Sequence, residues 1–132
     1  MKVTVDTNVL IRAVVRDDAK QALAADKILK DAELIAVAIP SLCEFVWVLS
    51  KLYGLNRQDI AAAIRALISA KSVVVDRQAV EAGLAIMEAG GDFADGVIAH
   101  EGKWLGAETF VSFDKKAVAL LKAQSVLAEL AT

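Results

Sequence analysis

The sequence predicts an α/β fold in which a mostly parallel sheet of four or five strands is covered by helices. Three observations support this prediction. Short apolar runs of strand type alternate with longer segments whose apolar residues recur at helical spacing, the order typical of parallel strands joined by helices. Helix start and stop signals fall between the runs. The length, 132 residues, suits one domain over residues 1–132.

Four short runs rich in Val, Ile, Leu or Phe are predicted to be strands. They are residues 3–5, 34–38, 73–75 and 110–111. The final residues, 125–132, could be a short edge strand or a loose tail, and both alternatives stay open.

Three segments between these strands carry apolar residues three and four positions apart, which places them on one face of a helix. The first stripe is Ala22, Ala25, Ile28 and Leu29, the second is Ile60, Ile64, Leu67 and Ile68, and the third is Val80, Gly83, Leu84 and Met87. The third stripe predicts a helix over residues 76–89.

The helix boundaries are marked by Pro, Gly and Asn. Pro40 suits the first turn of a helix, Gly54 suits its end, and Asn56 can cap the helix that follows. Gly90-Gly91 separates the third helix from a fourth, which Gly106 closes.

The composition is apolar for a soluble domain, with a hydrophobic fraction of 57%. We expect part of this surplus to cover a subunit or partner interface. The longest apolar runs, 34–40 and 45–49, are far shorter than the roughly 20 residues that span a bilayer. No secretory signal pattern opens the chain, so we expect a cytoplasmic protein without membrane contact.

The net charge of −2 argues against a protein that binds nucleic acid with its whole surface. Local basic pairs could contact phosphate or could simply be solvated; they are Arg12 with Arg16, Lys51 with Arg57, and Lys115 with Lys116.

The sequence offers little support for catalysis by cysteine or histidine, or for base stacking by tryptophan. Cys43 and His100 are the only cysteine and histidine, and a core thiol and a surface imidazole are the more usual roles. Trp47 and Trp104 stand in apolar helical surroundings and are more often core or interface than base-stacking residues.

Acidic residues follow the predicted strands or open the predicted helices. Asp6 and Asp114 each come directly after a strand, Glu44 lies one turn into a helix, and Asp92 and Asp95 share an opening helical turn. Ligands of open α/β sheets bind at the carboxyl ends of the strands. Carboxylates gathered there would repel one another and need a hard divalent cation, Mg²⁺ or Mn²⁺, which prefers oxygen ligands.

All of these acids except Asp6 also have a ready structural explanation. Ser41 and Glu44 could form a capping box, Asp92 could cap a helix with Asp95 as its third-position acid, and Asp114 could cap the next helix. Asp6 is harder to explain, because Asp-Thr-Asn is a poor continuation of a buried strand.

Four motifs resemble those of PIN-domain ribonucleases, particularly the VapC toxins of bacterial toxin–antitoxin pairs. They are Val5-Asp6-Thr7-Asn8-Val9-Leu10, Pro40-Ser41-Leu42-Cys43-Glu44, Asp92-Phe93-Ala94-Asp95-Gly96-Val97-Ile98-Ala99 and Ser112-Phe113-Asp114-Lys115-Lys116. They occur in the family's order, and the resemblance covers essentially the whole chain. One departure is Gly96, where a small helix former such as Ala is expected.

The resemblance implies a metal-binding quartet of Asp6, Glu44, Asp95 and Asp114. It further implies that Asp92 is an additional or outer acid, and that Thr7, Asn8 and Ser112 are supporting polar residues. The implied fold is a three-layer α/β/α sandwich. The implied activity is Mg²⁺- or Mn²⁺-dependent cleavage of RNA by a homodimer. A small antitoxin is expected to block the active site, and the protein is expected to contact DNA only indirectly, through that antitoxin.

We therefore expect Asp6, Asp95 and Asp114 to hold a metal ion that positions and deprotonates a water molecule. This water would attack the scissile phosphorus in line. Glu44 would orient the water or a second ion. The RNA target stays open. One alternative is a catalytically silent module that binds a partner through the same fold. Another is a phosphoacceptor signalling domain with Asp76 at a strand end, although Thr7 occupies the place of its second acid.

Overall fold

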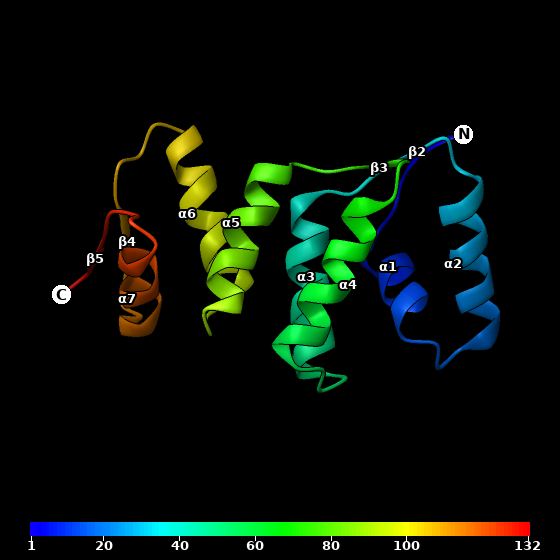
Figure 1. Cartoon of the computed structure of the whole chain (residues 1–132), viewed down its shortest axis with the longest axis horizontal. Coiled ribbons are helices and arrows are strands. Elements are labelled where there is room, and N and C mark those ends of the chain that lie inside the picture. The colour runs from blue at the N-terminus through cyan, green and yellow to red at the C-terminus, as the bar shows by residue number, and fades with distance from the viewer. The chain divides into compact units, whose positions relative to one another are not determined.

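A computed structural model describes all 132 residues, which divide into two compact units (Figure 1). Unit 1 is Met1–Asp76 and unit 2 is Arg77–Thr132. None of the helices combines the length and the apolar character needed to cross a membrane.

Unit 1 is built on a three-stranded parallel sheet in the order β1-β2-β3. The strands are β1 (Lys2–Thr4), β2 (Leu34–Ala36) and β3 (Val73–Val74), so three predicted strands are confirmed in place. Ile35 in the central strand is fully buried and stands in register with Val3 and Val73.

Four helices complete unit 1: α1 (Thr7–Val14), α2 (Ala19–Asp31), α3 (Ile39–Lys51) and α4 (Arg57–Ser69). The predicted start of α3 at Pro40 and the predicted cap of α4 are both found; Asn56 accepts a hydrogen bond from the backbone N–H of Asp59 at 2.8 Å. The chain passes from α3 to α4 through Gly54, whose φ of +67° suits glycine. The eight-residue helix α1 was not among the predicted stripes, although Thr7, Leu10 and Ile11 stand at helical spacing and are buried.

The predicted apolar stripes largely face the core of unit 1. Ala22 and Ala25 of α2 are buried, as are the three isoleucines of the α4 stripe, Ile60, Ile64 and Ile68. Ile28 differs, because it is 37% exposed and lines a surface hollow instead.

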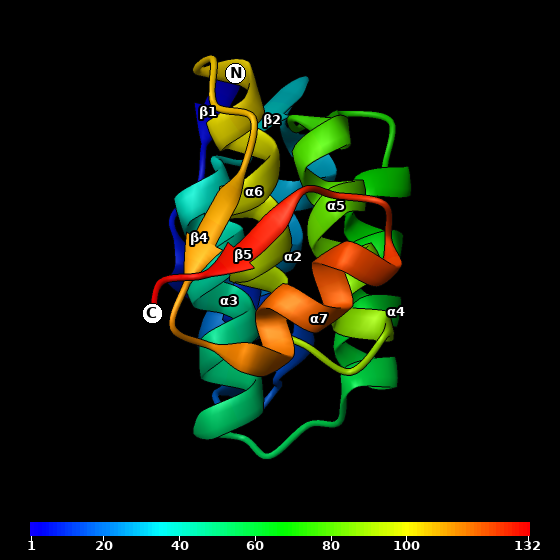
Figure 2. The ribbon, with the colours of Figure 1, turned by 90° about the vertical axis from the view of Figure 1, so that its left-hand side faces the viewer.

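Unit 2 consists of α5 (Arg77–Glu88), α6 (Phe93–Trp104), β4 (Phe110–Ser112), α7 (Lys115–Ala123) and β5 (Ala128–Leu130). Figure 2 shows β4 and β5 side by side with α7 packed against them. The two strands are parallel, so the open alternative for the final residues is resolved in favour of an edge strand. All four residues of the third stripe are buried in α5.

The helices α5 and α6 approach each other closely because glycines occupy the contact. A Cβ atom added at Gly83 would lie 2.6 Å from the Phe93 ring. A Cβ atom added at Gly96 would collide with the carbonyl of Ala82. The glycine at position 96, an unexpected residue for the resembled motif, is therefore required by helix packing.

The predicted α/β class with parallel strands is confirmed. The strands are few and short, and they fall into a sheet of three in unit 1 and a sheet of two in unit 2, where the sequence predicts one sheet of four or five. Alternating apolar runs indicate where strands occur, but pairing depends on tertiary contacts that such runs do not specify.

Candidate active site

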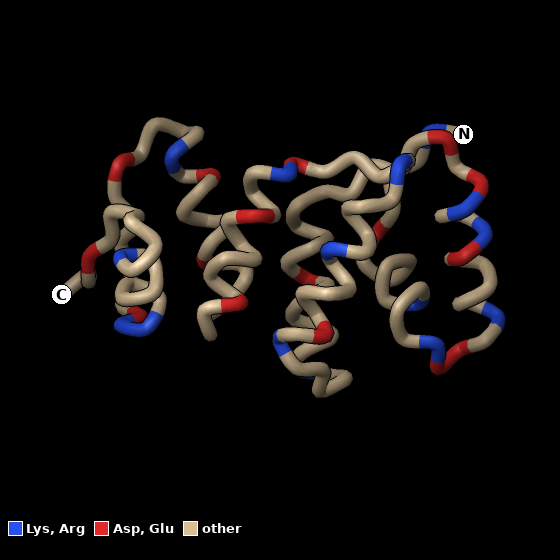
Figure 3. The backbone as a smooth tube through the Cα atoms, viewed as in Figure 1, with Lys and Arg blue, Asp and Glu red and all other residues tan.

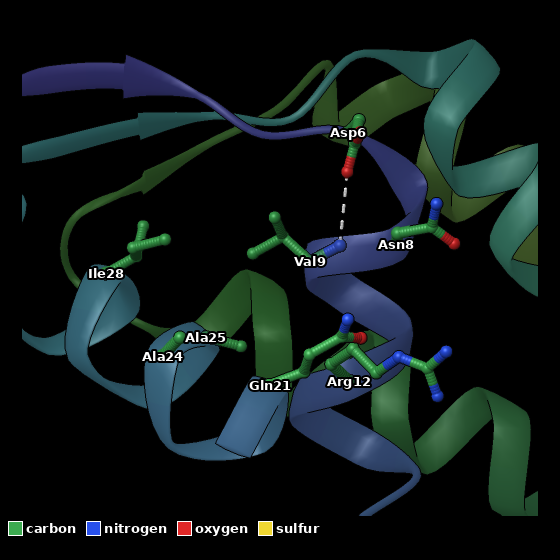
Figure 4. Close-up of a pocket in the computed structure, with 8 residues that line it drawn as sticks. All are labelled: Asp6, Asn8, Val9, Arg12, Gln21, Ala24, Ala25 and Ile28. Atoms are coloured by element: carbon green, nitrogen blue, oxygen red, sulfur yellow. Dashed lines mark hydrogen bonds between the residues drawn. The ribbon is translucent and has the colours of Figure 1, made fainter. Parts of the chain in front are cut away.

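Asp6 stands between β1 and α1 and caps the helix. Its backbone is extended, and its Oδ1 accepts a hydrogen bond from the backbone N–H of Val9 at 3.2 Å (Figure 4). Asp6, which was harder to explain from the sequence, therefore has a structural role, because an N-cap satisfies a helix-start N–H that lacks an intrahelical partner. The cap uses only one carboxylate oxygen of an exposed side chain.

Two surface hollows of unit 1 share Asp6. One, of about 420 Å³, lies between α1 and α2 and is lined by Asn8, Arg12 and Gln21 as well (Figure 4). The other, of about 570 Å³, is lined by Asp6, Ser41 and residues of β1. Asp6 is thus accessible from open space that a small ligand or a nucleotide can enter.

The supporting residues Thr7 and Asn8 differ in their environment. Thr7 is buried, and its Oγ1 donates to the backbone carbonyl of Ser41 at 3.4 Å, which ties the start of α1 to the first turn of α3. Asn8 is exposed and extends from the same side of α1 as Arg12 (Figure 4).

Glu44 does not form the capping box that the sequence allowed. The N-cap of α3 is Ala38, so Ser41 already lies inside the helix and cannot act as the cap residue. The Glu44 side chain is exposed and makes no hydrogen bond or ion pair. The hydrogen bond from Thr7 to Ser41 connects the start of α1 to α3, and Glu44 lies about one helical turn after Ser41.

In unit 2, Asp92 occupies the N-cap position of α6 but its side chain makes no capping hydrogen bond. The backbone carbonyl of Asp92 accepts from the backbone N–H of Asp95 at 3.1 Å. Asp95 is half-buried in the first turn. Neither the Asp92 nor the Asp95 carboxylate therefore caps α6, so capping does not explain why these two acids are present.

Asp114 does cap its helix, as the structural alternative predicted. Its Oδ1 accepts from the backbone N–H groups of Lys116 at 2.9 Å and Ala117 at 3.1 Å. The Oγ of Ser112 accepts from the backbone N–H of Asp114 at 3.0 Å, so Ser112 supports the turn in which this acid stands. Oδ2 of Asp114 takes no part in the cap.

Asp92 and Asp114 both act electrostatically on Asp95. The pKa of Asp95 is raised above its ordinary value by burial first, and then by the negative charges of Asp92 and Asp114. Burial and like charge both disfavour the ionised form of a carboxylic acid. The start of α6 and the end of β4 therefore bring the carboxylates of Asp92 and Asp114 close enough to act on Asp95.

The chemistry of these donors suits a hard divalent cation, because every candidate ligand offers carboxylate oxygen. In neither unit do three acidic, histidine or cysteine side chains stand close enough to hold a metal ion as a group. Asp6 and Glu44 belong to unit 1, and Asp95 and Asp114 to unit 2. The meeting of all four stays a prediction.

The structure assigns partners to basic residues that the sequence offered as phosphate contacts. Arg12 donates to Asp17 at 2.7 Å, and Arg16 makes a two-fold contact with Asp26 at 2.7 and 3.0 Å. Their charges are thus balanced by neighbouring acids. Lys51, at the end of α3, is exposed and has no ion pair.

The two tryptophans are not core residues. Trp47 is 57% exposed and Trp104 is 73% exposed, so the core alternative is wrong for both and the interface alternative stays open. The indole N–H of Trp104 donates to Nε2 of His100 at 3.1 Å. The sequence contained one indication that Trp47 is exposed. The charged residue Glu44 stands three positions earlier, and residues three apart lie on the same side of a helix.

The chain belongs to the PIN domain family, which it matches over residues 3–122. No curated protein matches the chain. PIN domains are generally nucleases that use divalent metals, so the protein has a nuclease-type fold. The matched range includes all the candidate residues and extends across both units.

Proposed function

We propose that the protein is a metal-dependent endoribonuclease in which Asp6, Glu44, Asp95 and Asp114 act together. The observation that carries the proposal is the raised pKa of Asp95 beside Asp92 and Asp114, in a chain of the PIN family. Self-repelling carboxylates are costly to keep in a fold, and a functional role in cation binding explains why they are present.

Mg²⁺ or Mn²⁺ would be held by Asp6, Asp95 and Asp114, with Glu44 beside them. When bound, such an ion lowers the pKa of water and stabilises negative charge on the phosphate. The quartet offers only carboxylate oxygens, which these ions prefer.

The residues of the chain prepare this chemistry in distinct ways. Asp6 and Asp114 are held by helix caps that each use Oδ1, so both side chains are oriented before any ligand arrives. Ser112 and Thr7 hold the turns around them. Glu44 has no partner and can orient the attacking water by accepting its hydrogen bond.

We further propose that the protein is a cytoplasmic toxin of the VapC type, a homodimer inhibited by a cognate antitoxin. The support is the order of the four motifs together with apolar side chains left in water. Trp104, Leu105 and Phe113 in unit 2 are between 73% and 89% exposed, which is unusual without a covering partner.

The test is incubation of the purified full-length protein with total RNA, with and without a chelator, followed by mapping of the cut ends. We expect cleavage that the chelator stops and that added Mg²⁺ or Mn²⁺ restores. Asp6→Asn and Asp95→Asn should each abolish cleavage while leaving the protein folded.

Asp59→Asn is the matched control, because Asp59 is also a first-turn acid, in α4, but has no part in the proposed quartet. It should cleave like the wild type. Cleavage that survives in Asp95→Asn would remove this residue from the mechanism. Activity that is insensitive to chelation would refute the metal-dependent reaction.

A further inference from the structure

We propose that an exposed face of α3 guides single-stranded RNA toward Glu44, with Trp47 stacking on an unpaired base and Lys51 contacting a phosphate. This inference rests on the proposed function, because it takes Glu44 as a member of the reaction centre. We call the three residues the α3 track.

The α3 track follows from helical spacing. Glu44, Trp47 and Lys51 are separated by three and four residues, so their side chains leave one side of the helix. They are spaced by ~4.5 Å and ~6 Å along the helix axis. All three are exposed, whereas the other side of α3 buries Leu42, Phe45 and Leu49.

Trp47 is free to take a stacking partner. Its side chain is 57% exposed and makes no hydrogen bond or ring contact. A large aromatic ring left in water gains from being covered, and bases of single-stranded nucleic acid supply flat surfaces for this. Duplex RNA cannot do so, because its bases are already stacked.

The charges on the α3 track fit RNA better than a protein partner. The ring stands between a carboxylate and an unpaired ammonium group, and the centre of a protein interface is depleted of charged residues. An aromatic side chain beside a cation is the usual combination for single-stranded nucleic acid. Lys51 attracts phosphate, whereas Glu44 repels any phosphate that is not bridged to it by a cation, so a base is favoured over a phosphate at the ring.

The chain contains two tryptophans, which makes each one a separable fluorescent reporter. The Trp104→Phe variant leaves only Trp47, and the Trp47→Phe variant leaves only Trp104. Each is titrated in chelator, without cleavage, with an RNA oligonucleotide that cannot pair with itself. We expect saturable quenching of Trp47 and little change in Trp104, and much weaker quenching of Trp47 by the same RNA annealed to its complement.

Affinity and kinetics supply a second measurement. Trp47→Ala should raise the Kd and the KM for single-stranded RNA about five- to a hundredfold, the range expected for one lost stacking contact. Trp47→Phe keeps a ring and should restore most of the affinity. A change confined to kcat would contradict a substrate contact.

Lys51→Ala tests the phosphate contact through salt. The slope of log Kd against log salt should fall by about 0.7, the value for one phosphate of a single strand. Lys30→Ala, which removes an exposed lysine of α2, is the matched control and should leave the slope unchanged. An unchanged slope for Lys51→Ala would remove Lys51 from the track.

These outcomes separate the inference from the proposed function. RNA cleavage with no quenching of Trp47 at saturating RNA would overturn the α3 track and leave the nuclease proposal standing. Saturable quenching without any cleavage would support the track and refute the nuclease. If Trp47→Ala dissociates an oligomer while the KM is unchanged, the face is an interface between copies of this chain, and the inference is wrong.

Discussion

Gly96 in α6 faces the backbone carbonyl of Ala82 in α5 so closely that no Cβ atom fits between them. The next residue toward the helix start is Asp95, the acid with the raised pKa. The close packing of two helices thus determines where the central acid of unit 2 stands.

The first prediction concerns this contact. Gly96→Ala should lower the free energy of unfolding by up to about 2 kcal/mol, because overpacking against backbone costs about 1–3 kcal/mol and outweighs the roughly 1 kcal/mol that Ala gains in helix propensity. Chemical denaturation measures the difference. Gly102→Ala is the matched control in the same helix, since its added Cβ would meet only the Cβ of Ala107 at 4.0 Å. It should stabilise the protein by up to about 1 kcal/mol; a Gly96→Ala protein as stable as the wild type would contradict the packing argument.

The second prediction concerns pH. Burial and the charges of Asp92 and Asp114 raise the pKa of Asp95 in the folded chain, so the folded state holds this proton to higher pH than the unfolded state does. The stability that Asp95 contributes is therefore full below the ordinary carboxyl pKa of about 3.9 and is lost as the pH rises through the raised value.

It follows that Asp95→Asn should be more stable than the wild type at neutral pH in chelator, with an advantage that disappears toward pH 3. Thermal unfolding of both proteins across this range measures the effect. Added Mg²⁺ or Mn²⁺ should raise the Tm of the wild type more than that of the variant, since binding to the folded state stabilises it. Equal stability of the two proteins at every pH would show that the repulsion is absent.

The third prediction separates two roles of Asp114. Asp114→Ala removes the acceptor for the N–H groups of Lys116 and Ala117 and should cost about 0.5–2 kcal/mol of stability. Asp114→Asn keeps an oxygen acceptor and should lose much less. Both variants should lose RNA cleavage, because the amide has no negative charge for a cation. If Asp114→Asn cleaves RNA normally, Asp114 is a cap and nothing more.

Much of the local structure could be predicted from the sequence because it depends on neighbouring residues. Asn56 caps α4, Pro40 opens α3, and Gly54 provides the turn between them, each through backbone preferences that act within a few residues. The division of the strands between two sheets could not be predicted, since it depends on contacts between distant segments.

The candidate site was predicted as a set of residues but not in its geometry. The cap formed by Asp6 was missed because the prediction treated Asp6 as the end of a strand, although Thr7, Leu10 and Ile11 have the helical spacing of the buried face of α1. The sequence did not decide between core and interface for Trp47, because its neighbours are apolar; in the structure Phe45 and Leu49 are buried and Trp47 is exposed. The role of Gly96 required knowledge of the contact with α5.

The pairing of β4 with β5 has a practical consequence for anyone who shortens or tags the protein. The family match ends at residue 122, yet Leu130 stands opposite Ser112, and the backbone N–H of Ala131 donates to the Ser112 carbonyl at 3.0 Å. A fragment trimmed to the match would lose the strand that fastens Ser112, two residues before Asp114. Expression variants should therefore keep the last ten residues and carry any affinity tag beyond Thr132 on a flexible spacer.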